Sequence, residues 1–153
     1  MIELQITNNY AFPLVHYPYN NGTYPDSNSP QTRIANKGTT QIITSEPESP
    51  FDPVFVDVPA MGPLLITQMN EDEINRYKKT DELKKQVASG TESYRYHSLL
   101  RYHGKNYYFM HDNPKVTIEV EFNSIGCMTI HNISAEKAVQ IPLYSISAKY
   151  PFN

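Results

Sequence analysis

The chain has 153 residues, a formal net charge of −3 and a hydrophobic content of 39%, values that suit one globular domain over residues 1–153. Its single cysteine excludes a disulfide-stapled miniprotein, and its composition excludes a coiled coil, a collagen or a disordered chain. The slightly acidic balance argues against a nucleic-acid binder, which usually carries a strong basic excess.

The first half of the chain is predicted to consist mainly of short strands. Residues 1–7 alternate apolar and polar side chains, which is typical of a half-buried strand. We expect further strands at 12–17, 39–45, 54–58 and 64–69, and a long loop rich in proline and asparagine at 18–31. The stretch 70–88 is highly charged and begins with an Asn that could cap a helix, so it predicts a short helical insertion.

The strand pattern returns after Gly90. Strands are expected at 94–103 and 107–110, joined by a tight turn at 103–106, and then at 126–131 and 139–147. The clearest strand is 115–122, where Val116, Ile118, Val120 and Phe122 share one face. About nine or ten strands without regular strand–helix alternation predict an all-β fold, an antiparallel β-sandwich.

The start of the chain lacks both a cationic segment and an apolar run long enough for a signal peptide, and no stretch approaches the length of a membrane span. We therefore expect a soluble protein made in the cytoplasm, which could be released afterwards to act on other cells.

Catalytic and metal motifs are weak in this sequence. Cys127 and His131 would lie roughly 13 Å apart on one strand, too far for a hydrogen bond, so Cys127 is predicted to be a buried core residue. The five histidines show no metal-ligand spacing, and glycine-rich phosphate loops and hydrolase elbows are absent. We expect neither an enzyme nor a bound cofactor or metal, although an enzyme without a motif, or an immunity-type interaction protein, stays open.

The stretch from Tyr94 to the following hairpin combines tyrosines with basic side chains. One strand face carries Arg95, His97, Leu99, Arg101 and His103, Lys105 lies at the turn, and Tyr107 and Tyr108 follow. This face would become more basic as the pH falls through about 6.5. It suits a phosphate-bearing partner such as a lipid headgroup, and the alternative is an ordinary solvated face over a tyrosine-rich core.

The tyrosine excess has a second centre near the 18–31 loop. The chain holds twelve tyrosines against six phenylalanines and no tryptophan, and every hydroxyl must meet water or a hydrogen-bond partner. An aromatic cluster surrounds this loop and the first strands, and its rings could stack on sugars or lie at a bilayer interface; its members are Tyr10, Phe12, Tyr17, Tyr19 and Tyr24. The alternative is that they pack the loop against the sandwich.

The order of segments resembles that of a known family. The first strand ends in Asn8-Asn9, the run Ile34-Ala-Asn-Lys-Gly-Thr-Thr-Gln-Ile-Ile-Thr follows, and Val116-Thr-Ile-Glu-Val-Glu-Phe-Asn comes later. This layout is similar to that of the aegerolysins, small β-sandwich proteins that include partners in bacterial two-component insecticidal toxins. The resemblance implies a module that recognises membrane lipid and recruits a larger pore-forming protein.

Together these observations lead to a functional hypothesis. We expect a non-enzymatic module that binds membrane lipid or a cell surface, as a component of a toxin system. A carbohydrate-binding, lectin-like module that uses loop tyrosines and asparagines is the alternative.

Overall fold

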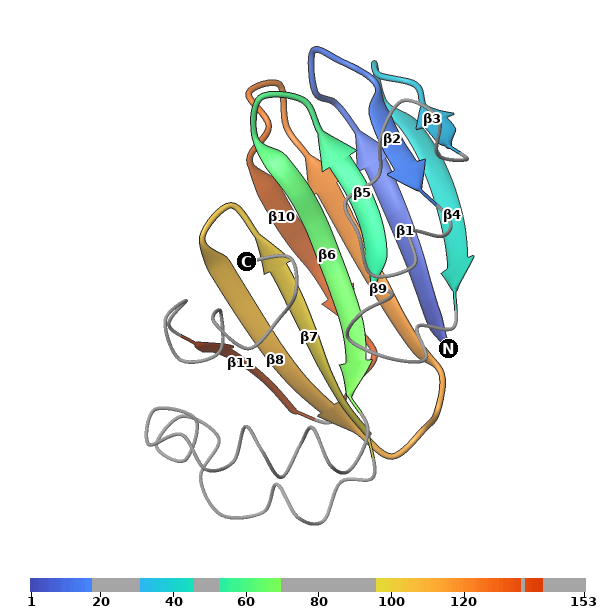
Figure 1. The fold of residues 1–153 in the computed structure, drawn as a ribbon, viewed down its shortest axis with the longest axis vertical. Helices are drawn as coiled ribbons and strands as arrows, with labels where there is room; N and C mark the ends of the chain where they lie inside the picture. The colour runs from blue at the N-terminus through green and yellow to red at the C-terminus, as the bar shows by residue number, and fades with distance from the viewer. Residues whose placement is uncertain (18–30, 46–52, 70–95, 136, 142–153) are drawn as a thin grey trace.

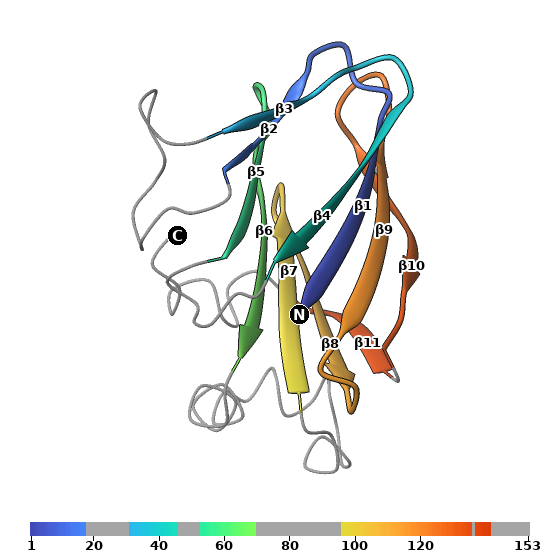
Figure 2. The same cartoon turned by 90° about the vertical axis from the view of Figure 1, so that its right-hand side faces the viewer.

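A computed structural model describes residues 1–17, 31–45, 53–69, 96–135 and 137–141, and these residues form a β-sandwich of two sheets (Figure 1). The first sheet has the order β10 (Met128–Ile133), β9 (Val116–Phe122), β1 (Ile2–Asn8) and β4 (Thr39–Ser45). The second has the order β11 (Lys137–Ile141), β8 (Lys105–His111), β7 (Tyr96–Tyr102), β6 (Gly62–Met69), β5 (Val54–Val58), β2 (Leu14–Tyr17) and β3 (Thr32–Ile34). Figure 2 shows the two layers from the side.

The predicted all-β class is confirmed, and most predicted strands lie within a few residues of the observed ones. The bounds of β4 and β5 match the predictions, and the described residues contain no helix. Thr32–Ile34 adds a short strand that the pattern did not predict. The helical insertion predicted at 70–88 lies outside the described residues.

Strand alternation accounts for the four-stranded sheet. β9 buries every second residue, from Val116 to Phe122, and β1 does the same from Ile2 to Asn8. The two strands pair in parallel, with Ile2 opposite Val116, whereas all other pairs between the described strands are antiparallel. The sandwich is therefore mostly rather than purely antiparallel.

One hydrophobic core fills the space between the sheets. The four-stranded sheet contributes residues such as Leu4, Ile118 and Phe122, and the seven-stranded sheet contributes residues such as Val56 and Phe109. These side chains carry most of the apolar burial, the main favourable term in folding. The sandwich thus holds its turns and edges on a closely packed body.

The seven-stranded sheet is buried on both faces over its middle strands. Leu100 and Tyr102 of β7 face the core between the sheets, yet His97 and Leu99, which point the other way, are only 1% exposed. Phe55 and Leu65 form a second small cluster, with Tyr17 packed against it. The prediction of a solvated basic face on this strand is therefore wrong for most of its length.

Candidate functional site

Five turns lie toward one end of the sandwich; those after β1, β3, β5 and β9 are at the top of Figure 1, and the β7–β8 turn lies lower. They comprise residues 9–13, 35–38, 59–61, 103–104 and 123–127 and connect β1 to β2, β3 to β4, β5 to β6, β7 to β8 and β9 to β10. We call this surface the turn end. Loops placed by a rigid scaffold are where proteins most often carry function.

Hydrogen bonds join the first two turns to each other. The buried side chain of Asn8 donates to the carbonyl oxygens of Phe12 (3.1 Å) and Ile34 (3.2 Å), and its own oxygen accepts from the amide of Tyr10 (2.9 Å). Asn36 donates to the carbonyl of Ala11 at 2.9 Å. The β1–β2 and β3–β4 connections are therefore held as one unit.

Tyrosine hydroxyls attach the other turns. Tyr10 donates to the carbonyl of Pro59 at 2.6 Å, and Tyr102 donates to the carbonyl of Gly126 at 2.5 Å. Burial raises the pKa of the Tyr102 phenol, and the neighbouring Tyr10 and Cys127 raise it further, so the phenol keeps its proton. His103 Nδ1 donates to the carbonyl of Met61 at 3.2 Å. These bonds link all five turns into one platform.

Among the residues that the structure describes, three non-glycine residues have a positive φ, and each lies in one of these turns. They are Lys37 at 67°, Ala60 at 67° and His103 at 46°. The left-handed region is costly for residues with a Cβ, and it is found where the surrounding structure enforces it. In the two-residue β7–β8 turn, His103 and Gly104 both have the positive φ that a type I′ hairpin requires.

Large apolar and basic side chains project from the turn end. Phe12 is 53% exposed and Ile125 is 69% exposed, and both lie in these turns. Lys37 and His103 in these turns, and Lys105 directly after one of them, are exposed as well. None of the five turns contains an aspartate or a glutamate. The surface therefore combines two apolar tips with two lysines and a histidine, and these turns contain no carboxylate that could pair with them.

The hollow at this end is too small for an organic ligand. It measures about 50 Å³, room for a few waters, and is lined by Met61, Tyr102, His103, Lys105, Cys127 and Met128. Recognition by the turn end would therefore use its projecting side chains, since the hollow offers so little volume.

Of the predicted binding residues that the structure describes, only His103 and Lys105 are exposed at the turn end. His97 and Tyr108 are each 1% exposed, and His97 Nδ1 lies 2.5 Å from the Tyr108 hydroxyl. The predicted basic strand face is therefore not exposed at His97, because the rings of His97 and Tyr108 are both buried and pair with each other.

The remaining predicted binding residues do not form one outward surface. Tyr107 packs against the main core, and Arg101 is half-buried. Tyr17 and Phe55 pack edge to face, with their ring centroids 5.7 Å apart. Tyr19, Tyr24 and Arg95 lie outside the described residues. The hydrogen-bonded core therefore accounts for Tyr10, Tyr102 and Tyr108, whose hydroxyls all have protein partners.

Cys127 was predicted to be a buried core residue, but it is exposed in the β9–β10 turn, so that prediction is wrong. His131 is also exposed, and its Nε2 lies 3.2 Å from a carboxylate oxygen of Glu121. Within the described residues, no group of three or more histidine, cysteine, aspartate or glutamate side chains could hold a metal ion.

The signal for Phe12, Ile125 and Lys37 was present in the sequence but dispersed. They belong to three turns far apart along the chain, and only the strand order brings those turns to one end.

Comparison with known proteins returned no matching family model, no matching curated protein and no matching solved structure. Among the described residues there is no helix long and apolar enough to cross a membrane.

Proposed function

We propose that this protein attaches to the membrane–water interface through the turn end. The observation that carries the proposal is the pairing of exposed Phe12 and Ile125 with Lys37, His103 and Lys105, in turns without carboxylates. Apolar tips enter the boundary between headgroups and acyl chains, and nearby cations are attracted to anionic lipid.

The energies of these groups suit reversible attachment. Burying one large apolar side chain contributes about 1.5–3 kcal/mol, and a lysine near an anionic leaflet contributes about 1 kcal/mol. One such group gives only marginal binding, so attachment requires the tips and the cations together. The hydrogen bonds through Asn8, Tyr10 and Tyr102 support the proposal, because a surface that is already ordered loses little entropy on binding.

In this proposal the chain performs no covalent chemistry. It marks a target membrane and brings a larger pore-forming partner to it. This part is supported by the similarity of the segment order to that of the aegerolysins.

Co-sedimentation with vesicles tests the attachment. We expect the chain to bind vesicles of phosphatidylcholine mixed with phosphatidylserine, and to bind pure phosphatidylcholine less well. The double variant Phe12→Ser/Ile125→Ser should lose at least tenfold in affinity, because two apolar groups no longer leave water. Lys37→Ala/Lys105→Ala should lower affinity for the anionic vesicles by about fivefold per charge and affect neutral vesicles little.

Ile42 provides the matched control. It is 57% exposed, as the two tips are, but it lies on β4 and outside the five turns. Ile42→Ser should leave vesicle binding unchanged. Equal losses from Ile42→Ser and from the tip variants, or no binding by the parent chain to any vesicle, would overturn the proposal.

A further inference from the structure

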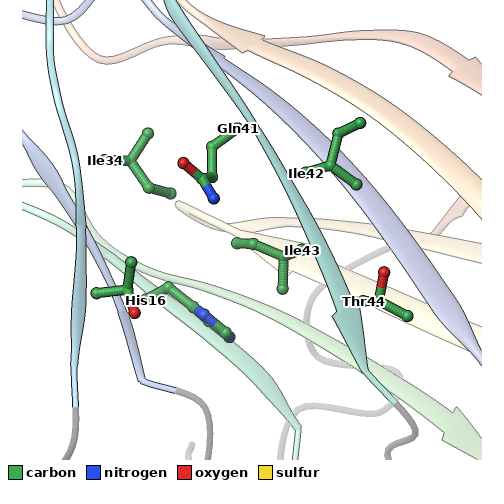
Figure 3. A pocket seen from close by; sticks show the side chains of 7 residues that line it. His16, Ile34, Gln41, Ile42, Ile43 and Thr44 are labelled. Atoms are coloured by element: carbon green, nitrogen blue, oxygen red, sulfur yellow. The ribbon is translucent and has the colours of Figure 1, made fainter.

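A cleft lies at the open side of the sandwich, between β4, an edge strand of the four-stranded sheet, and β2–β3, the edge of the other sheet. It measures about 230 Å³ and is lined by His16, Thr32, Ile34, Gln41, Ile42, Ile43 and Thr44. Figure 3 shows Gln41 and Ile43 on the side of β4 that faces His16 and Ile34. The cleft belongs to neither the turn end nor the buried His97–Tyr108 region.

Polar side chains occupy inward positions of these edge strands. Gln41 pairs with Ile6 across the sheet, and Ile43 pairs with Leu4, so all four residues point to the same face. On the other sheet His16 pairs with Thr32, two residues from the buried pair of Leu14 and Ile34. In most sandwiches, strand alternation places apolar side chains at such inward positions. Here polar residues occupy them, so polar side chains line the cleft between β4 and β2–β3.

The polar side chains have hydrogen-bonding capacity to offer. Within the described part of the chain, no hydrogen bond engages the side chains of His16, Thr32 or Gln41. Burial lowers the pKa of His16, so near neutral pH its ring is uncharged and offers one donor and one acceptor. The amide of Gln41 and the hydroxyl of Thr32 also both donate and accept.

We propose that this cleft binds a neutral sugar ring. Among the described residues, the lining contains no carboxylate, lysine or arginine, which disfavours charged ligands, since a buried charge without a partner is costly. Its mixed donors and acceptors match hydroxyl groups, and the buried Ile34 and Ile43 form an apolar base beneath them. The volume lies below the roughly 300–1,000 Å³ of sites for drug-sized molecules, so the ligand is about one ring in size.

The sugar site is independent of the proposed membrane attachment, because it uses different residues and its test contains no lipid. We would record saturation-transfer NMR with methyl α-D-glucopyranoside, methyl α-D-mannopyranoside, methyl β-D-galactopyranoside and N-acetyl-D-glucosamine. Glucuronic acid serves as the charged counterpart. We expect transfer to at least one neutral sugar, with affinity at least tenfold above that for glucuronic acid.

Variants then locate the site. Thr32→Val removes one hydroxyl at nearly constant shape, and Gln41→Leu places an apolar group beside the core, so both should fold. Each should weaken sugar binding by about tenfold, since a ligand hydroxyl loses its partner. Gln5→Leu is the matched control, because Gln5 pairs with Ile42 on the outward face of the same sheet.

The outcomes divide clearly. Binding that is lost in Thr32→Val and Gln41→Leu but kept in Gln5→Leu supports the site. The proposal is overturned by an absence of transfer from every neutral sugar, by equal or tighter binding of glucuronic acid, or by variants of the cleft that bind as the parent does.

Discussion

The turn end and the middle of the seven-stranded sheet use the same residue types in opposite ways. Around the turns, Tyr10 and Tyr102 donate to backbone carbonyls and thereby hold Phe12 and Ile125 out in solvent. In the middle of the sheet, His97 and Tyr108 satisfy each other and are withdrawn from solvent. Aromatic polar residues therefore become scaffold or core according to what accepts their hydrogen bond, and residue type alone does not decide which.

The largest expected effect separates the two regions by stability. Tyr108→Ala removes a fully buried ring and leaves His97 without this partner, so we expect a loss of about 3–5 kcal/mol in the free energy of unfolding. Phe12→Ala, at a 53% exposed position, should change it by no more than about 0.5 kcal/mol. Urea denaturation measures both. Similar losses in the two variants would remove the distinction.

A second test asks how tightly the turns pack. A Cβ at Gly126 would lie 2.8 Å from Met61 Cγ and 3.1 Å from Tyr10 Cε1, whereas nothing lies within 4 Å of one at Gly104. Both glycines have a positive φ, so Gly104→Ala costs about 1–2 kcal/mol from the backbone alone. Gly126→Ala should cost about 1–3 kcal/mol more because of the crowding. Equal costs in thermal unfolding would mean that the turns are loosely packed against each other.

Ala60 allows the strain in the turn end to be relieved. It follows Pro59 in a turn closed by a 2.9 Å bond from the Met61 amide to the Val58 carbonyl, and its φ is 67°. Position i+2 of a type II turn favours glycine, so Ala60→Gly should stabilise the protein by about 0.5–1 kcal/mol. Ala11→Gly, at a turn residue without a positive φ, should instead destabilise it slightly. A loss of stability in Ala60→Gly contradicts this account of the turn.

The smallest expected effect is on the pH dependence of stability and comes from His16, which is less exposed than the turn end and less buried than His97. Burial lowers its pKa from 6.5, so below about pH 6.5 the unfolded chain binds this proton more readily than the folded one. The free energy of unfolding should therefore fall as the pH drops below 6.5, and that of the His16→Gln variant should fall less steeply. Burial raises the pKa of Asp57, which acts in the opposite direction, but that contribution is shared by both proteins and cancels in the difference. Parallel pH profiles from urea denaturation would exclude this role for His16.

Sequence reasoning recovered the strands that have one buried face. β1 and β9 alternate strictly because one side meets the core and the other meets solvent. The same reasoning failed on β7, where the polar rings of the second face are buried as fully as the leucines. A strand covered on both faces loses its alternation of burial, and histidine and tyrosine conceal this when they pair inside the sheet.

The candidate site was harder to predict than the fold. His103 was identified as the last residue of the predicted basic strand face, and Lys105 as a charge in the predicted 103–106 turn. Ile125 and Lys37 were not, and Phe12 was identified only as a member of the aromatic cluster with Tyr10, because their proximity depends on strand order, which a local pattern does not encode. The cleft at Gln41 depends on the register of two edge strands in different sheets, and that also requires the tertiary structure.

The parallel pairing of β1 with β9 determines when folding can be completed. β1 lies between β4 and β9, so one of its edges is covered by a strand nearby in the chain and the other by residues 116–122. During synthesis, the edge of β1 that later pairs with β9 stays unpaired until residues 116–122 have left the ribosome. Closure of such a distant contact is slow, and an exposed strand edge invites association with other chains. The four-stranded sheet is therefore the part of the molecule where a chaperone would be needed and where shortened products would aggregate.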